Sequence, residues 1–300
     1  MAEARPEKEN QMIARLPPWF RQEIPKDIDF IRNRLRYFEN HKLNTVCVSA
    51  HCPNINHCFE NGSATFMILG DNCSRDCRFC AVNKGRPEAL ELSEPYNLAL
   101  TIRRLDLKYV VLTSVTRDDL VYGGASQYAR AVYLIKQFNP GKKIELLIPD
   151  FRESADALSL VAVSCPDVIA HNLETVERMY PYVRPLGDYR RALRVLKRLK
   201  ELGFAGLIKS GIMLGFGEQE EEVLAAIEDL NNSCCDIITL GQYLAPGKGH
   251  FPVKEFISPE KFEFYRQKAL KFGFKAVYAG ALVRSSYRAG EVFSDLVYGL

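Results

Sequence analysis

The chain has 300 residues, of which 47% are hydrophobic and 26% are charged, a composition typical of a folded globular protein rather than a disordered, collagen-like or coiled-coil chain. Its 40 Lys and Arg residues against 37 Asp and Glu residues leave a formal net charge of +3, which by itself indicates neither a nucleic-acid partner nor a membrane. No apolar run reaches the ~18 residues that a bilayer span needs, and residues 1–12 lack the apolar core of a signal peptide. We therefore expect a cytoplasmic protein.

The regular pattern of the chain begins after a polar and aromatic N-terminal segment, in which one helix is predicted for residues 27–38. Six short β-rich runs follow, mostly separated by segments with helical periodicity: 64–69, 109–113, 144–148, 167–170, 206–214 and 237–240. The clearest helix covers residues 189–202, where leucines form one apolar stripe and Gly203 marks the end. This alternation predicts an α/β fold, a partial parallel (β/α)6 barrel with right-handed crossovers.

Each predicted strand is followed by polar or Gly-rich residues. They are Gly70-Asp71-Asn72, Arg117-Asp118-Asp119, Pro149-Asp150, Asn172 with Glu174, Gly215-Phe216-Gly217-Glu218, and Gly241-Gln242-Tyr243. In a parallel β/α barrel these positions meet at the C-terminal mouth, where such folds carry their chemistry. We therefore expect the site at that mouth.

Cysteine usage is the strongest chemical signal, because six of the nine cysteines lie within residues 47–80. In a reducing compartment, grouped thiols indicate metal or cluster ligands. Cys73, Cys77 and Cys80 form a C-x3-C-x2-C loop directly after the first predicted strand. Three thiolates leave one iron of a cubane cluster open to a substrate, whereas a zinc ribbon favours paired C-x2-C knuckles, which this sequence does not have.

The other three cysteines, Cys165, Cys234 and Cys235, lie beside apolar runs. Because a free cysteine packs as a small hydrophobic side chain, we expect all three in the core.

With the aromatic Phe79 just before its last cysteine, the C-x3-C-x2-C loop resembles the radical S-adenosylmethionine superfamily. The resemblance implies a 4Fe-4S cluster on Cys73, Cys77 and Cys80, with S-adenosylmethionine at its open iron. It also implies cofactor contacts from Phe79, Asn172, Glu174, Gly215 and Glu218. Each of these residues alone has a simpler structural explanation. Glycines after a strand usually mark a tight turn, and an acidic residue near the start of a helix is stabilised by the helix dipole.

The second triplet, Cys47-x4-Cys52-x5-Cys58, narrows the resemblance to the lipoyl synthase family. The match continues through segments that include Arg117-Asp118-Asp119-Leu120, His171-Asn172-Leu173-Glu174-Thr175 and Val283-Arg284-Ser285-Ser286-Tyr287. It implies a second 4Fe-4S cluster on Cys47, Cys52, Cys58 and Ser286. The N-terminal extension (1–62) and the C-terminal extension (281–300) would hold this cluster around a radical S-adenosylmethionine barrel of residues 63–280.

A serine ligand has a chemical reason. Serine oxygen is a harder ligand than a thiolate and binds the cluster iron less strongly, so the iron at that corner is released more easily. Ser285 and Ser286 are adjacent, so on an extended segment they would point to opposite sides and only one would be a ligand. The family match selects Ser286, while the physical argument leaves both open.

The resemblance implies a radical sulfurtransferase that inserts two sulfur atoms into the octanoyl chain of an N6-octanoyl-lysine on a lipoyl carrier domain. The expected carriers are the acyltransferase subunit of 2-oxoacid dehydrogenases and the glycine cleavage H protein. An electron donor and an iron–sulfur carrier are further expected partners, and nucleic acid and membrane are not.

Two other classes of protein stay open at this point. One is a zinc-dependent binding module, which would not need six β/α units with polar strand ends. The other is a related dual-cluster enzyme, either biotin synthase or a methylthiotransferase. The 13 residues after Tyr287 leave no room for the RNA-binding domain that a methylthiotransferase usually carries.

The predicted helix 189–202 also carries a basic face, made of Arg190, Arg191, Arg194, Lys197, Arg198 and Lys200. Charge runs on amphipathic helices usually face water, so a solvated outer barrel helix is the preferred interpretation. The alternative is a surface that steers an acidic carrier domain.

Overall fold

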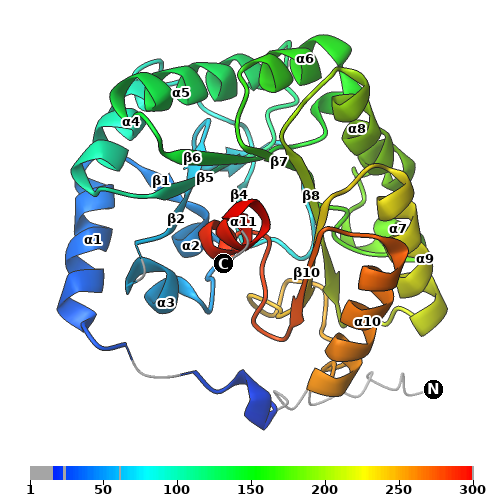
Figure 1. Cartoon of the computed structure of the whole chain (residues 1–300). Coiled ribbons are helices and arrows are strands. Elements are labelled where there is room, and N and C mark those ends of the chain that lie inside the picture. The colour runs from blue at the N-terminus through cyan, green and yellow to red at the C-terminus, as the bar shows by residue number, and fades with distance from the viewer. Residues whose placement is uncertain (1–15, 23–24, 61, 299–300) are drawn as a thin grey trace, which may run out of the picture.

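The polypeptide chain, seen here in a computed structural model that describes residues 16–22, 25–60 and 62–298, folds around one curved sheet of eight strands (Figure 1). Its strands stand in the order β1-β2-β5-β6-β7-β8-β9-β10. Neighbouring strands from β2 to β10 are parallel, and β1 pairs with β2 antiparallel at one edge. These strands are β1 (Asn44–Thr45), β2 (Ala64–Ile68), β5 (Tyr109–Ser114), β6 (Lys143–Leu147), β7 (Val168–Ala170), β8 (Leu207–Leu214), β9 (Ile237–Gln242) and β10 (Ala276–Gly280). A separate parallel pair joins β3 (Asn72–Cys73) to β4 (Asn83–Lys84).

Helices cover the outer face of the curved sheet, as Figure 1 shows for α4, α5, α6, α8, α9 and α10. The α-helices are α1 (Ile28–Asn40), α2 (Val46–Ser49), α3 (Ile55–Glu60), α4 (Glu94–Arg104), α5 (Ala125–Phe138), α6 (Ala155–Val163), α7 (Tyr180–Val183), α8 (Tyr189–Glu201), α9 (Glu220–Asn232), α10 (Pro259–Phe272) and α11 (Ala289–Tyr298). The described part of the chain also contains three short 3-10 helices: η1 (Pro18–Phe20), η2 (Phe151–Glu153) and η3 (Glu177–Met179). None of the described helices is long and apolar enough to cross a membrane.

Local sequence explains the main elements. All five residues of β2 are buried, as expected for a parallel strand covered on both faces. Helix α8 begins where the Asp188 side chain accepts a hydrogen bond from the Arg191 amide, and its leucine stripe faces the core. Helix α10 begins with Ser258 as its cap and ends at Gly273, which adopts the left-handed conformation.

The six predicted strands are all present, with ends displaced by at most two residues, and the α/β partial barrel is confirmed. The sheet also contains a seventh parallel strand, β10, which the sequence pattern did not reveal. Three of its five residues are Ala or Gly, which have low strand propensity, so only pairing with β9 defines it. The barrel is open, since β1 and β10 are the two edges of the sheet.

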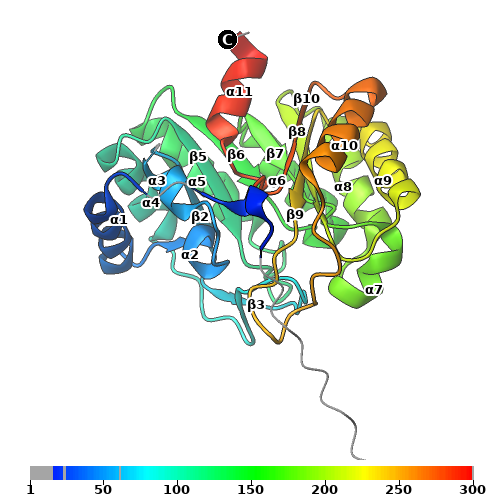
Figure 2. The same ribbon diagram turned by 90° about the horizontal axis from the view of Figure 1, so that it is seen from below.

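Segments from both ends of the chain lie across this opening and the adjacent barrel end. Figure 2 shows α11 projecting at one end of the barrel, with β3 at the other. The α11 end corresponds to the starts of the strands, because Phe293 packs against Tyr109, the first residue of β5, with ring centroids 5.9 Å apart. Across the opening, the Asn54 side-chain amide donates to the Leu282 carbonyl at 2.6 Å.

The prediction that three isolated cysteines are buried is correct for Cys235 and wrong for the other two. Cys165 and Cys234 are exposed. They occupy left-handed turns shortly after α6 and α9, with φ of 56° and 62°, and this backbone conformation turns their side chains outward. Apolar neighbours in the sequence therefore gave a misleading signal, because the turn geometry decided the direction.

Candidate functional site

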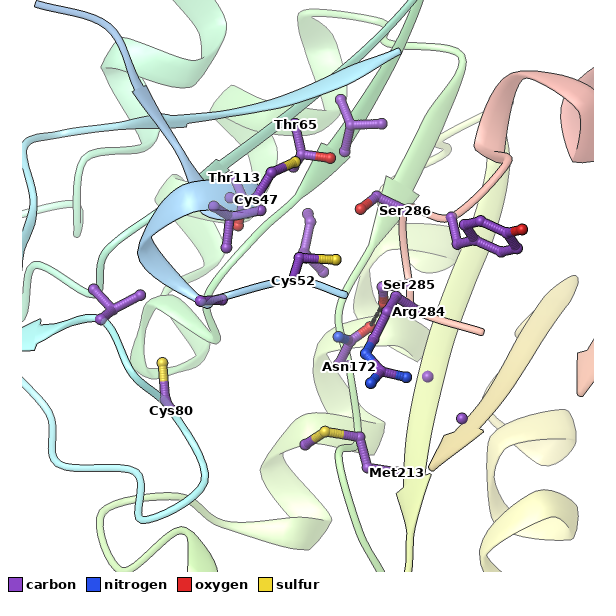
Figure 3. Close-up of a pocket in the computed structure, with 18 of the residues that line it drawn as sticks. Cys47, Cys52, Thr65, Cys80, Thr113, Asn172, Met213, Arg284, Ser285 and Ser286 are labelled. Carbon is purple, nitrogen blue, oxygen red and sulfur yellow. Dashed lines mark hydrogen bonds between the residues drawn. The ribbon is translucent and has the colours of Figure 1, made fainter. Parts of the chain in front are cut away.

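One cavity of about 530 Å³ occupies the barrel interior, and all six clustered cysteines line it. None of the six forms a disulfide. Phe79, Asn172, Glu174 and Ser286 line the same cavity, so most of the predicted site residues converge (Figure 3). Its volume lies within the range of small-molecule and cofactor sites.

The loop with Cys73, Cys77 and Cys80 lies past the C-terminal end of β2, at the mouth where the site was expected. The Thr116 amide donates to Cys73 Sγ at 3.4 Å, and the Ser74 amide and hydroxyl both donate to the Thr116 carbonyl. Burial raises the pKa of the Cys77 thiol, and that of Cys80 to about 12. The thiols of Cys77 and Cys80 are thus protonated at neutral pH, and a metal must displace those two protons to bind.

Arg75, inside this loop, anchors it to two other strand ends. Its guanidinium donates to Asp118 at 2.7 and 2.9 Å, and to Asp150 at 2.7 and 2.8 Å. Burial by itself raises the pKa of Asp150, but the hydrogen bonds and charge of Arg75 outweigh it and hold that pKa well below its ordinary value. The loop is therefore fixed by a buried, charge-assisted network.

The second triplet lies on the N-terminal extension, with Cys47 in α2 and Cys58 in α3. Cys47 hydrogen-bonds with Thr65 of β2, which places it near the start of that strand. Burial raises the pKa of Cys47 to about 11 and that of Cys58 to about 12. The rise along β2 from Thr65 to the strand end at Ile68 is roughly 10 Å, so the two triplets lie at different levels along this strand.

The two serines of the C-terminal segment have different surroundings. The Ser285 hydroxyl donates to Asn172 Oδ1 at 2.5 Å. Figure 3 shows the Ser286 hydroxyl on the other side, directed toward the space in front of Cys47 and Cys52. The geometry therefore favours Ser286 over Ser285 as the oxygen available to a cluster on the second triplet.

Two strand glycines make room for this segment. A Cβ added at Gly241 of β9 would lie 2.1 Å from the Val283 carbonyl oxygen, far inside van der Waals contact. A Cβ at Gly211 of β8 would lie 3.1 Å from both Asn172 Oδ1 and Ser285 Oγ. The C-terminal segment can approach the inner face of the barrel only because these positions lack a side chain.

The segment that follows the C-terminal end of β7 forms a polar wall of the cavity. Asn172 bridges Ser285 and the carboxylate of Glu174. Burial raises the pKa of Glu174, while the charge of Arg184 and the hydrogen bond from Asn172 oppose that shift. Glu174 has φ of 73°, an unusual conformation for a residue other than glycine and one that clusters at functional sites.

His171 completes this wall as a neutral side chain. Its Nδ1 lies 2.8 Å from the Ile148 carbonyl oxygen, which only accepts hydrogen bonds, so Nδ1 carries the proton and Nε2 is an acceptor. Burial lowers the pKa of His171 to about 4, and Nε2 has no partner among the described residues. An unpartnered buried acceptor of this kind fits a ligand with a hydroxyl or amide hydrogen.

Gly215 and Glu218 are the predicted site residues that the structure does not bring to the cavity wall. The Glu218 carboxylate accepts from the Gly215 and Phe216 amides at 2.5 and 2.9 Å, so it stabilises the turn before α9. A Cβ at Gly215 would lie 2.2 Å from Gln242 Nε2, which gives this glycine a packing reason.

Sequence reasoning gave no role to Arg75, Arg184 and Arg284. Arg184 lines the cavity beside Glu174 and donates to the Asn172 carbonyl at 3.3 Å. Arg284 also lines it, and burial lowers the pKa of its guanidinium while the nearby Cys52 thiolate opposes that shift. A signal for Arg284 was available, because it belongs to the Arg-Ser-Ser-Tyr segment.

The donor set fits clusters better than single ions. Among the described residues, no three Cys, His, Asp or Glu side chains converge on a point that could hold one metal ion, as a structural zinc site requires. Three thiols spread around an open space, with a fourth position left to another donor, suit a larger iron–sulfur cube. Each triplet supplies three thiols to the same cavity.

The fold and the site define the class of protein. The sequence model of the Radical SAM superfamily matches residues 67–230, so the chain is a radical S-adenosylmethionine enzyme, a class that uses a 4Fe-4S cluster and S-adenosylmethionine. Methylornithine synthase has a similar solved structure, with a TM-score of 0.53 and 17% identity, covering 73% of this chain and 72% of that one. This likeness shows the shared fold.

Closer relatives identify the family. The chain is 50% identical over 283 residues to lipoyl synthase from Caldicellulosiruptor bescii, covering 94% of this chain and 96% of the relative. It is 50% identical over 280 residues to lipoyl synthase from Caldanaerobacter subterraneus subsp. tengcongensis, covering 93% and 97%. The chain belongs to the lipoyl synthase family and functions as a lipoyl synthase.

Proposed function

We propose that this chain inserts two sulfur atoms into the octanoyl chain of an N6-octanoyl-lysine, with the two cysteine triplets in separate roles. Cys73, Cys77 and Cys80 hold the cluster that binds S-adenosylmethionine. Cys47, Cys52, Cys58 and Ser286 hold a second 4Fe-4S cluster that donates sulfur. When bound, the first group supplies the electron that releases a 5′-deoxyadenosyl radical from S-adenosylmethionine, and the second supplies sulfide.

The observation that carries this proposal is the arrangement of both triplets around one cavity, with an oxygen of Ser286 turned toward the second triplet. The common cavity provides proximity, since an alkyl radical has to meet sulfur before any other partner. Apolar side chains, including Met67, Val111, Ile212 and Met213, line the same space and suit an octanoyl chain.

The polar wall suits the cofactor in this proposal. Asn172 and Glu174 offer an amide and a carboxylate for hydroxyl groups of S-adenosylmethionine, and Phe79 lines the same cavity as an aromatic surface. Gly215 and Glu218 stay in the proposal as residues that shape the adjoining turn, since their contacts are internal.

We propose octanoylated lipoyl carrier domains as the substrate proteins, namely the acyltransferase subunit of 2-oxoacid dehydrogenases and the glycine cleavage H protein. An electron donor and an iron–sulfur carrier complete the set of partners. The division of the chain into the extension 1–62, the barrel 63–280 and the extension 281–300 belongs to the same proposal. Residues 1–15 of the first extension lie outside the described residues.

Anaerobic metal analysis tests the two-cluster assignment directly. The purified chain should hold about eight irons, two sets of four. Stoichiometric zinc in their place would contradict the proposal.

Single substitutions separate the two roles. Cys77→Ala should abolish formation of 5′-deoxyadenosine, whereas Cys52→Ala should still form it and yield no lipoyl product. Sulfur insertion by Cys52→Ala at the wild-type rate would show that the donor assignment is wrong.

A further inference from the structure

A buried group of three polar side chains closes one end of the cavity. Lys209 Nζ donates to both carboxylate oxygens of Glu145, at 2.9 and 3.0 Å, and the Tyr109 hydroxyl donates to Glu145 Oε2 at 2.8 Å. The side chains of Lys209 and Glu145 are each 1% exposed. The interior layers of a parallel barrel are usually filled by branched apolar side chains, so an ion pair in this layer is unusual. Of these three residues, Tyr109 is the one that lines the cavity.

The C-terminal helix supports the Tyr109 ring from outside the barrel. Figure 1 shows α11 over the centre of the barrel, and Ala289 and Gly290 at its start line the cavity together with Tyr109. A Cβ added at Gly290 would lie 3.0 Å from Tyr109 Cβ, and the Phe293 and Tyr109 rings pack with centroids 5.9 Å apart. Displacing the ring would also remove a hydrogen-bond donor from the buried Glu145 carboxylate, which is costly. The Tyr109 ring is therefore a fixed floor of the cavity.

The cavity is accessible from the opposite end. Two residues of its lining, His51 and Ala245, are exposed, and they lie in the turn after α2 and beyond the C-terminal end of β9. In the proposed reaction the acyl chain is attached to a lysine of another protein domain, so its amide end stays at this accessible end. Its methyl end then points toward the starts of the strands, where the floor lies.

The register of the strands gives the depth of the floor relative to the second triplet. Cys47 hydrogen-bonds with Thr65 of β2, and Thr65 pairs with Val111 of β5. Tyr109 precedes Val111 by two residues on the same face of β5, so it lies roughly 7 Å further from the mouth. Sulfur from the second triplet therefore meets an acyl chain near the level of Val111, and the floor begins one layer of side chains below.

We propose that Tyr109 determines the length of the acyl chain that the enzyme accepts, as the floor on which the methyl end of the octanoyl chain rests. This inference rests on the proposed function, because it takes octanoyl-lysine as the substrate. Carbon atoms beyond the eighth would have to enter the volume of the Tyr109 ring. Since one methylene in an apolar pocket is worth about 10–200-fold in kcat/KM, a decanoyl chain should be converted at most about one-tenth as well as an octanoyl chain.

The test is a competition between two short peptides, one with octanoyl-lysine and one with decanoyl-lysine, in equal amounts with the cluster-loaded enzyme, S-adenosylmethionine and a chemical reductant. Mass spectrometry measures the two doubly thiolated products. Their ratio does not depend on how much of a variant is folded, because both peptides compete for the same active molecules.

Two substitutions of the floor and one control are compared. Tyr109→Val removes the ring and deepens the cavity, whereas Tyr109→Phe keeps the ring and removes only the hydroxyl. Val111→Ala is the matched control, because it removes volume from the same strand face at the level of the second triplet and leaves the floor in place.

We expect Tyr109→Val to raise the ratio of decanoyl to octanoyl product at least about tenfold, the effect of one methylene or more, and Tyr109→Phe and Val111→Ala to change it by less than about threefold. An unchanged ratio in Tyr109→Val would overturn the inference. An equal rise in Val111→Ala would also overturn it, because general widening of the cavity would then explain the result. Equal conversion of both peptides by the wild type would show that no floor limits the chain at this depth.

A binding measurement covers variants that form no product. If Tyr109→Val converts neither peptide, the affinities of the two peptides for the unreduced enzyme, measured by equilibrium dialysis, decide by the same ratio. A wild-type enzyme with both clusters that converts neither peptide would instead contradict the proposed sulfur insertion itself.

Discussion

The loop that carries Cys73, Cys77 and Cys80 is anchored through Arg75 to two other strand ends, whereas the segment that carries Cys47, Cys52 and Cys58 is tied to the opposite end of the chain. In the first region, buried ion pairs within the barrel fix the loop. In the second region, two contacts join the N-terminal and C-terminal extensions. Asn54 donates a hydrogen bond to the Leu282 carbonyl, and His57 packs against Tyr287 with ring centroids 5.6 Å apart.

This difference indicates that the two regions can fail separately. The first triplet depends on the barrel alone, so it should survive damage to the chain ends. The second requires that residues more than 200 positions apart dock across the open side of the barrel. A change that displaces the C-terminal segment should therefore remove one cluster and spare the other.

Gly241→Ala is expected to give the largest effect of this kind. Its Cβ would lie 2.1 Å from the backbone oxygen of Val283, so the C-terminal segment and Ser286 must move away. We expect iron to fall from about eight to about four per chain and lipoyl formation to be lost, while 5′-deoxyadenosine is still formed. Iron analysis and product chromatography measure these outcomes.

Gly249→Ala is the matched control, because a Cβ there meets nothing within 4 Å. It should keep both clusters and wild-type turnover. Gly241→Ala with eight irons and unimpaired sulfur insertion would show that the docking of the C-terminal segment does not depend on this close approach.

Arg75→Met tests the other side of the comparison. It removes one of the two cations that pair with buried Asp150 and leaves Arg191 as the other, so we expect a loss at or below the lower end of the about 3–5 kcal/mol in the free energy of unfolding that breaking a buried pair typically costs. Urea unfolding of the metal-free chain measures this loss. Arg178→Met, which breaks an exposed pair with Glu222, should cost less than about 1 kcal/mol. Similar losses in both variants would contradict the anchoring role.

The same network predicts acid sensitivity. Arg75 holds the folded-state pKa of Asp150 and of Asp118 below the ordinary carboxyl value of about 3.9, so their contribution to stability is present above that value and is lost as the pH falls toward the depressed pKa. Unfolding measured from neutral to acidic pH should show this loss in the wild type. Arg75→Met should show a smaller dependence, and an equal dependence in both would contradict the prediction.

Ser286→Cys is a milder change that sharpens the picture of the second region. A thiolate should bind the same iron corner more firmly than the serine oxygen, so we expect a full iron complement with sulfur transfer slowed several-fold. Ser285→Ala removes the hydrogen bond to Asn172, worth about 1 kcal/mol, and should be less harmful. Single-turnover product formation compares the two. Equal losses, or a larger loss in Ser285→Ala, would reverse the ligand assignment.

Substitutions on α8 are expected to have the smallest effect on turnover. In the structure, the arginines of its basic face are paired with acidic side chains. The pairs are Arg190 with Glu177, Arg191 with Asp150, Arg194 with Glu153 and Arg198 with Glu201. This pairing favours the solvated outer helix over a carrier-steering surface.

Replacing both Arg194 and Arg198 by Gln should therefore change turnover of an octanoylated carrier domain at low ionic strength by less than about twofold, since exposed pairs contribute little. A short octanoyl-lysine peptide serves as the comparison substrate. A large loss confined to the carrier domain would restore the steering interpretation.

The sequence by itself determined what depends on neighbouring residues. The hydrophobic runs located six of the seven parallel strands of the main sheet, because a strand buried on both faces is apolar throughout. Cys73, Cys77 and Cys80 fall within eight residues directly after a strand, so their convergence at the barrel mouth followed from local spacing. The cysteines of the second triplet could be grouped from their spacing in the same way, but their position relative to the barrel could not be predicted from the sequence.

Only the tertiary structure decided what depends on distant contacts. Ser285 and Ser286 are alike in the sequence, and Asn172, 113 residues away, separates them by engaging the first. Arg75 pairs with Asp150, 75 residues away in the sequence. The reason for a glycine at position 241 is the close approach of the Val283 carbonyl, which only the folded chain brings there. Hydrogen bonds and steric exclusion act over a few ångströms in space, and sequence separation carries no information about them until the chain is folded.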